Sequence, residues 1–207
     1  MRRLIVGALL SALLTLTAAM ALRASDATIA VAALAAVTVL FTWYAQLHST
    51  EEHGTLELAN PASAVTLAVV GRRPWATLLP VLAAHTIGAV IGGFAALALD
   101  DRLGDTLVFT QPGLVVTAVG ATLVGLIGAW ATLSVDGGGQ EAFSAVPVVV
   151  GGAVLPLGLI AAFQPAAVVG LATAGLVPWD VALVSAGAVL AASVVGAYAV
   201  SLLVPQE

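Results

Sequence analysis

The strongest constraint in this sequence is a series of six apolar runs, each long enough to cross a lipid bilayer. A helix that spans the hydrocarbon core needs about 20 predominantly apolar residues. Such runs cover residues 4–22, 27–47, 74–98, 108–134, 143–163 and 178–204. The composition agrees, because 61% of the residues are hydrophobic and only 8% are charged, which is more apolar surface than a soluble domain of this size can bury. We therefore expect an all-α polytopic membrane protein.

The first run follows two arginines and has two interpretations, a cleaved signal peptide or a retained helix. Ala-Leu-Arg-Ala at 21–24 resembles a weak cleavage site. However, the apolar region of a signal peptide is usually about 7–15 residues long, whereas the run 4–22 is long enough to span. We favour a retained first transmembrane helix.

Two further apolar segments, 61–71 and 165–175, are too short to span, and each begins with a proline. With their flanking residues they are NPASAVTLAVVGRRPW, from residue 60, and QPAAVVGLATAGLVPW, from residue 164. Eight of these sixteen positions are identical at a constant offset of 104 residues, about half the chain. The identical pairs are Pro61/Pro165, Ala62/Ala166, Val65/Val169, Leu67/Leu171, Ala68/Ala172, Gly71/Gly175, Pro74/Pro178 and Trp75/Trp179. We infer an internal duplication within a single membrane domain, 1–207, with repeats 1–103 and 104–207.

The duplication continues into the helix that follows each short segment, as a stripe of small residues at four-residue spacing. The two stripes are Ala84, Gly88 and Gly92, and Ala188, Ala192 and Gly196. Small residues at this spacing let helix backbones approach closely inside a membrane. We expect both stripes to serve helix packing.

Each repeat would hold three spanning helices and one half-helix, so the second repeat would enter the membrane in the opposite orientation. Inverted repeats place their functional sites near the midplane, at discontinuous helices. With the N-terminus inside, the arginines divide four to two: Arg2, Arg3, Arg72 and Arg73 inside, Arg23 and Arg102 outside. This excess of cytoplasmic arginine predicts that both termini lie on the cytoplasmic side of the plasma membrane.

The starts of the half-helices carry the groups that we expect to face a permeant. Pro61 and Pro165 suit the first helical position, and Asn60 is among the best N-caps, with Gln164 at the equivalent point. Each first turn leaves free N–H donors and about half a positive charge. Amide NH₂ groups can donate to a neutral permeant, while two converging positive ends repel cations.

These motifs resemble those of the aquaporin (major intrinsic protein) family. The tripeptide Asn60, Pro61 and Ala62 looks like the first signature of that family. The tripeptide Gln164, Pro165 and Ala166 is similar to the second, with Gln in place of Asn. The resemblance implies six transmembrane helices with two re-entrant half-helices in an inverted tandem repeat, and a pore that both tripeptides line. It also implies a passive channel for water or small neutral solutes such as glycerol, assembled as a homotetramer in the lipid bilayer.

The sequence departs from the pattern of that family at the selectivity filter. Family members typically follow the second signature with an arginine, and this chain has Ala167 there. Loss of a guanidinium should leave the outer constriction, lined by Ala167, wider and less polar. The inward glutamates of the first and fourth helices of the family are also missing, with Gly7 and Thr117 as their approximate equivalents.

His85 lies in the segment AAHTIGAVIGG, 83–93, which resembles the third helix of the family with His in place of Gln. An ionisable residue within a membrane span is a functional hypothesis by default. Two roles remain open for His85, a neutral group that hydrogen-bonds between helices to support a half-helix loop, or a pore-lining group.

The segment His48-Ser-Thr-Glu51-Glu52-His53 invites a metal or pH-gate hypothesis. A spacing of five residues would leave the two imidazoles about 140° apart on a helix, so we favour a solvated loop and expect no metal site.

Other functional classes find little support in the sequence. It contains no catalytic motif, and every Asp and Glu falls in a predicted loop or at a helix end, so we expect no enzyme activity and no cofactor. The net charge of −5 and the lack of a basic patch argue against nucleic-acid binding. Two rivals to a channel remain: a non-conducting membrane protein with the same fold, and a secondary transporter, which the lack of intramembrane charge disfavours.

Overall fold

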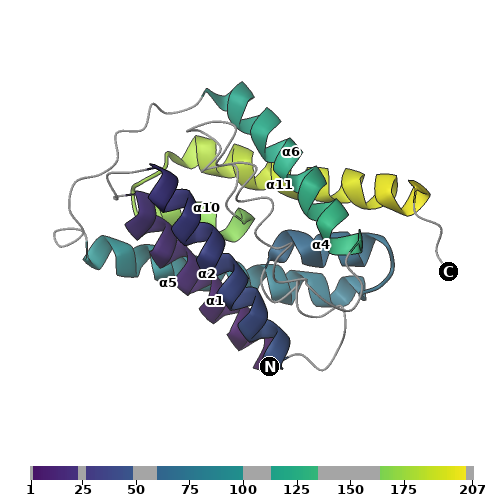
Figure 1. The fold of residues 1–207 in the computed structure, drawn as a ribbon, viewed down its shortest axis with the longest axis horizontal. Helices are drawn as coiled ribbons and strands as arrows, with labels where there is room; N and C mark the ends of the chain where they lie inside the picture. Colours follow the sequence, from purple (N-terminus) through teal and green to yellow (C-terminus); the bar gives the residue numbers. More distant parts are fainter. Residues whose placement is uncertain (1, 23–26, 49–59, 100–112, 135–163, 204–207) are drawn as a thin grey trace.

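The computed structural model describes residues 2–22, 27–48, 60–99, 113–134 and 164–203, and within these ranges the chain forms helices and no strand (Figure 1). Five helices are long: α1 (Arg2–Leu22), α2 (Ala27–His48), α5 (Leu78–Ala98), α6 (Leu114–Ser134) and α11 (Trp179–Leu203). Three elements are short: α4 (Pro61–Val69), the 3₁₀ turn η1 (Trp75–Thr77) and α10 (Pro165–Thr173).

Four helical segments are long and apolar enough to cross a membrane: Arg3–Leu22, Trp75–Ala98, Leu114–Leu133 and Trp179–Leu203. Their outer faces carry large exposed apolar side chains, such as Leu79 and Leu202. Lipid tails solvate such faces, whereas water would not. The protein is therefore a helical membrane protein, as the sequence predicts.

The predicted helix boundaries agree with the structure to within a few residues at most ends. α6 begins at Leu114, where the carbonyl of Gly113 accepts the first hydrogen bond, from the Thr117 N–H at 3.0 Å. The start predicted at 108 lies outside the described residues. The predicted fifth span, 143–163, lies outside the described residues.

The two short helices, α4 and α10, have nine residues each, so each is about 13 Å long, less than half of a bilayer core of about 30 Å. They also end alike. Gly71 and Gly175 adopt φ values of 75° and 73°, in the left-handed region that glycine enters without strain. The next residue donates its N–H to the carbonyl of Leu67 or Leu171, which closes both helix ends in the same way.

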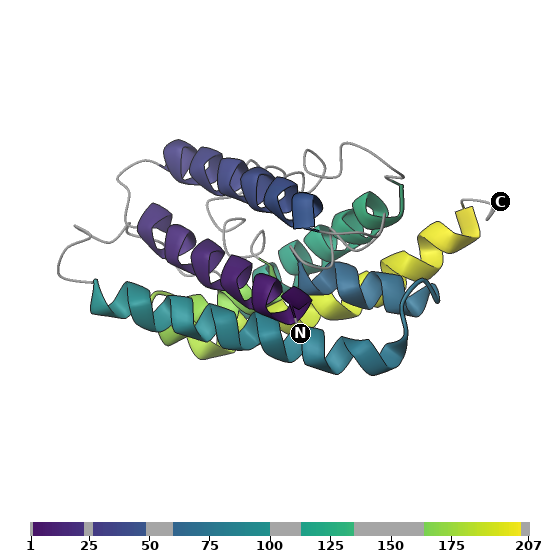
Figure 2. The same ribbon diagram turned by 90° about the horizontal axis from the view of Figure 1, so that it is seen from below.

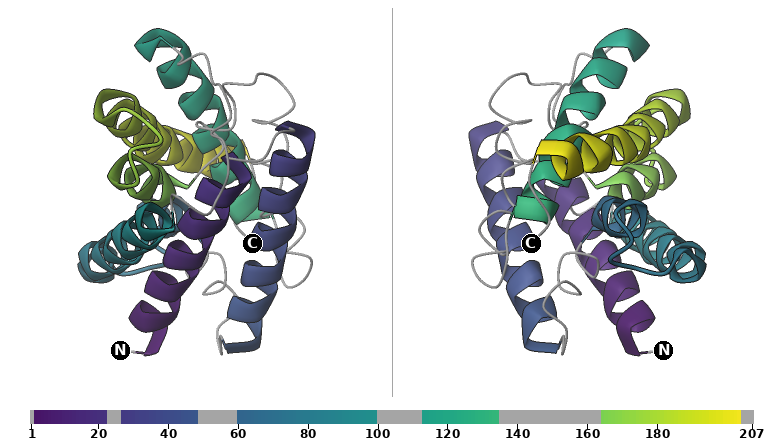
Figure 3. Two further views of the ribbon diagram at one scale, coloured as in Figure 1. Left: turned by 90° about the vertical axis from the view of Figure 1, so that its left-hand side faces the viewer. Right: turned by 90° about the vertical axis from the view of Figure 1, so that its right-hand side faces the viewer.

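Each short helix packs against helices of the opposite repeat. α10 has its most extensive contacts with α5, and α4 with α11 and then α6. α4 runs from the middle of the molecule toward one end, and α10 runs from the middle toward the other (Figures 1 and 2). α2 lies on the side of α1 away from α5 (Figures 2 and 3). Each short helix thus makes its most extensive contacts with a helix from the other half of the sequence.

Small residues bring the two most intimate helix pairs, α1 with α5 and α6 with α11, into contact. A Cβ atom added at Gly88 or Gly92 would overlap a backbone carbonyl of α1, that of Ala8 or of Ala12. A Cβ added at Gly196 would lie 2.7 Å from the Cβ of Ala129. In the same two stripes Ala192 is buried, and Ala84 and Ala188 are partly buried.

Gly88→Ala should destabilise the protein, because the new methyl group would force α5 away from α1. Overpacking of this kind costs about 1–3 kcal/mol, and each kcal/mol lowers the Tm by about 2–4 °C in a chain of this size. Thermal unfolding in detergent measures the change. Gly187→Ala is the matched control, since a Cβ there meets no atom within 4 Å; equal losses in both variants would contradict the packing role.

Candidate functional site

The N-terminal end of α4 is capped by Asn60. Asn60 has an extended backbone, and its Oδ1 accepts a hydrogen bond from the Ala62 N–H at 2.9 Å, as an N-cap does. Pro61 fills the first helical position, where its missing N–H costs nothing. Because the cap uses Oδ1, the Nδ2 amide of Asn60 takes no part in it and can donate a hydrogen bond elsewhere.

One buried side-chain hydrogen bond fastens α4 to the second repeat. Ser63 Oγ on α4 lies 3.0 Å from Thr132 Oγ1 on α6. The Thr132 hydroxyl also donates to the carbonyl of Gly128 at 2.7 Å, so Ser63 supplies the proton of the shared bond. This contact fixes the first half-helix against a helix of the other half of the chain.

Gln164 stands before α10 as Asn60 stands before α4, but it does not cap its helix. The sequence predicts two equivalent amide caps, and the structure corrects this for the second, where the Gln164 side chain makes no cap hydrogen bond. Gln has one methylene more than Asn, which carries its amide beyond its own first turn. Its Nε2 instead donates to Ser11 Oγ on α1, at 3.3 Å.

Ala62 and Ala166 are the last residues of the two predicted pore motifs, and they differ in whether a side chain caps their backbone N–H. Both lie in the first turn of their short helix, α4 or α10. The Ala62 N–H donates to the side chain of Asn60, whereas the Ala166 N–H receives no cap from Gln164. The resemblance implies that both alanines line a pore. Ala62 is 6% exposed and Ala166 is 3% exposed, so both belong to the buried first turns of their helices.

Gln164, Ser11 and His85 form a buried hydrogen-bond chain across α10, α1 and α5. Ser11 Oγ lies 2.6 Å from His85 Nδ1. The three side chains are 6%, 0% and 1% exposed, respectively. When the imidazole carries its proton on Nε2, Gln164 donates to Ser11 and Ser11 donates to Nδ1, so the Ser11 hydroxyl acts as both acceptor and donor.

The position of His85 favours the helix-joining role over the pore-lining role. Its imidazole lies against Gly7 of α1, where an added Cβ would be 3.0 Å from Nε2. Only glycine leaves this room for the ring. His85 thus occupies the space that a side chain at position 7 would take, and it links α5 to α1.

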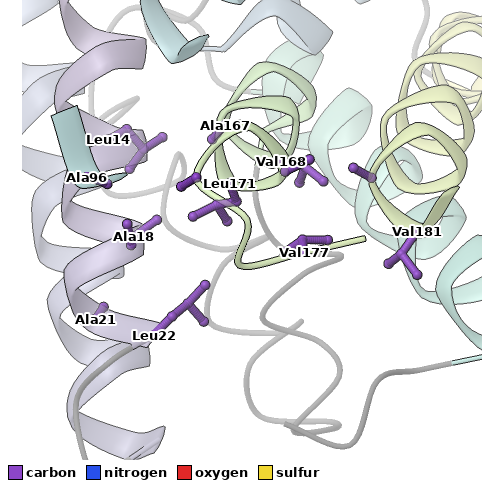
Figure 4. Packing of buried hydrophobic residues seen from close by; sticks show 14 residues of the cluster. Leu14, Ala18, Ala21, Leu22, Ala96, Ala167, Val168, Leu171, Val177 and Val181 are labelled. Atoms are coloured by element: carbon purple, nitrogen blue, oxygen red, sulfur yellow. The ribbon is translucent and has the colours of Figure 1, made fainter. Parts of the chain in front are cut away.

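Ala167, where the sequence predicts a widened outer filter, is fully buried, with an exposed fraction of zero. It belongs to an apolar cluster between α1 and α10 that includes Leu14, Val168 and Leu171 (Figure 4). Leucine and valine side chains fill the space that the small residue leaves.

No motif in the sequence points to Ser11 or Thr15. They are fully buried and face the second half-helix from α1. Their signal in the sequence is two hydroxyls four residues apart in an otherwise apolar run, which places them on one face of a helix.

Among the residues that the structure describes, no group of three or more His, Cys, Asp or Glu could hold a metal ion. The predicted loop Glu51-Glu52-His53 lies outside those residues, and His48 is the last residue of α2.

The fold and this site define the chain as a helical membrane protein with two opposed half-length helices, each of which begins with a proline after an amide side chain. No protein-family model matches the chain, and no curated protein matches it. What it does must therefore be inferred from its own residues.

Ser11→Ala should destabilise the protein, because it leaves Gln164 Nε2 and His85 Nδ1 without the hydroxyl that both contact. A buried polar group left unsatisfied costs about 1–3 kcal/mol. Denaturant or thermal unfolding measures the loss, with Thr17→Val as a control, since the Thr17 hydroxyl donates only to its own helix. In a double-mutant cycle with His85→Leu, the losses in the free energy of unfolding should not be additive. Additive losses would argue against a connected hydrogen-bond chain.

Proposed function

We propose that the protein is a passive membrane channel for water and small neutral solutes, a divergent member of the aquaporin family. The observation that carries this proposal is the pair α4 and α10. These nine-residue helices begin at equivalent prolines, each after an amide side chain, and run from the middle of the molecule in opposite directions. Half-helices opposed in this way are typical of channels and transporters built from inverted repeats.

The burial of the short helices supports a position within the membrane. All residues from Pro61 to Ala68 are buried, and so are most residues of α10. Interrupted helices persist at membrane depth only where protein covers them or where they line an aqueous path. In the proposal α4 and α10 are therefore re-entrant, and the segment 143–163 completes six spans.

The charge at the two helix ends suits an uncharged permeant. Each N-terminal end contributes about half a positive charge, and Asn60 adds an NH₂ donor for a permeant oxygen. Cations would meet two repulsive ends, whereas water or glycerol would meet hydrogen-bond donors. The proposed assembly is a homotetramer in the plasma membrane, each subunit having its own path and cytoplasmic termini.

A second candidate function is a non-conducting membrane protein that uses this fold for packing or for binding a partner. The closed packing around Ala166 and Ala167 favours it. The engagement of Gln164 with Ser11 also favours it, because that amide nitrogen is already used within the protein.

Liposomes that contain the protein should shrink faster after osmotic shock than empty liposomes, as followed by light scattering with water and glycerol side by side. Asn60→Ser keeps an N-cap but removes the NH₂ donor, so it should fold normally and lower the excess permeability roughly two- to tenfold. Asn60→Leu removes both the cap and the donor. Thr86→Val, a change on the exposed face of α5, is the control and should leave permeability unchanged.

Permeability no higher than that of empty liposomes for both solutes, with correctly folded protein, would contradict the channel and favour the non-conducting alternative. Uptake coupled to protons or sodium would instead indicate a secondary transporter.

A further inference from the structure

Two buried polar atoms at the interface of α1 and α10 need a hydrogen-bond partner that the described residues do not supply. They are Gln164 Oε1 and Thr15 Oγ1, on side chains that are 6% and 0% exposed. A buried polar atom without a partner is costly, and especially so in a membrane, where lipid cannot provide one. Such a pair points to a bound molecule.

Within the described part of the chain, Gln164 lacks one hydrogen-bond partner whichever way its side-chain amide is oriented. The amide places one atom on Ser11, and in this structure that atom is Nε2, at 3.3 Å. If the amide were reversed, Oε1 would accept from Ser11 and Nε2 would lose its partner. In both orientations one amide atom still requires a hydrogen bond from elsewhere.

The Thr15 hydroxyl differs from those of other helical threonines. Six of them donate to the carbonyl four residues earlier, at 2.7–3.2 Å: Thr17, Thr66, Thr86, Thr117, Thr132 and Thr173. Thr15 makes no such bond. Its methyl group lies against Gly170 of α10, where an added Cβ would be 2.5 Å away. The side chain of Thr15 therefore faces α10, one helical turn from Ser11.

We infer that Gln164 and Thr15 bind a single water molecule between α1 and α10. Water both donates and accepts, so it satisfies the amide in either orientation and the hydroxyl at once. A charged ligand would be unpaired among the neighbouring apolar side chains. A larger solute has no room, because Ala167 is fully enclosed and the backbones of α5 and α10 meet at Gly93 and Gly170.

This water would extend the Gln164–Ser11–His85 chain and fasten the second half-helix to α1. The site does not require conduction, so it goes beyond the proposed channel. A protein that transports nothing could still hold this water, and a channel could lack it.

Thr15→Val tests the inference through the sign of a stability change. If Thr15 hydrogen-bonds a water, the isosteric valine removes that bond, and the Tm in detergent should fall by about 2–6 °C. If the site is dry, valine removes an unsatisfied buried hydroxyl, and the Tm should stay constant or rise. Thr17→Val controls for the same replacement at a partly exposed position of α1, where the hydroxyl bonds only to its own helix. A Tm that does not fall relative to this control would overturn the inference.

A high-resolution experimental structure of the full-length protein provides the second test. The expected result is an ordered water within about 2.7–3.2 Å of Thr15 Oγ1 and of a Gln164 amide atom. A protein side chain in that place would overturn the inference. So would direct contact between the two groups, or a dry interface in a map that resolves other internal waters.

Discussion

The rest of the structure depends on one requirement, that every backbone polar group inside a bilayer finds its hydrogen-bond partner within the protein. Long helices meet it along their own length, but α4 and α10 begin inside the packed molecule, where their first N–H groups lack helical partners. Pro61 and Pro165 each remove one such donor, and Asn60 satisfies another. Gln164 does not satisfy the equivalent donor and reaches instead to α1. The buried chain through Ser11 to His85 follows from that difference.

Close backbone packing holds these helix starts in place, and it does so unequally in the two repeats. A Cβ at Gly93 would overlap the carbonyl of Gly170, so α5 and α10 meet backbone to backbone. At an offset of 104 residues the equivalent positions are Ala197 and Thr66, neither of which is glycine. The contacts of α10 with α5 are also more extensive than those of α4 with α11, although both short helices end in the same glycine turn.

The elements could be predicted from the sequence because their signals are local. Apolar length predicts the described spans, and the prolines and glycines that flank α4 and α10 predict the short helices. The site could be predicted only in part. The cap at Asn60 involves neighbours in the chain, whereas the partner of Gln164 lies on α1, 153 residues away. Ala167 is likewise buried in a cluster that includes Leu14 of α1. No local pattern in the sequence predicts which helix packs against Ala167.

The unequal starts of the two half-helices bear on selectivity in the proposed channel. Asn60 uses its oxygen for the cap and keeps its NH₂ for a permeant. Gln164 uses its NH₂ to bind Ser11 and keeps its oxygen. A path past the two helix starts would therefore present the donor of Asn60, whereas the remaining amide atom of Gln164 is buried and lies in the proposed water site. The added methylene of Gln164 thus directs the second amide into the protein, and the selectivity of the proposed channel would depend on the first motif.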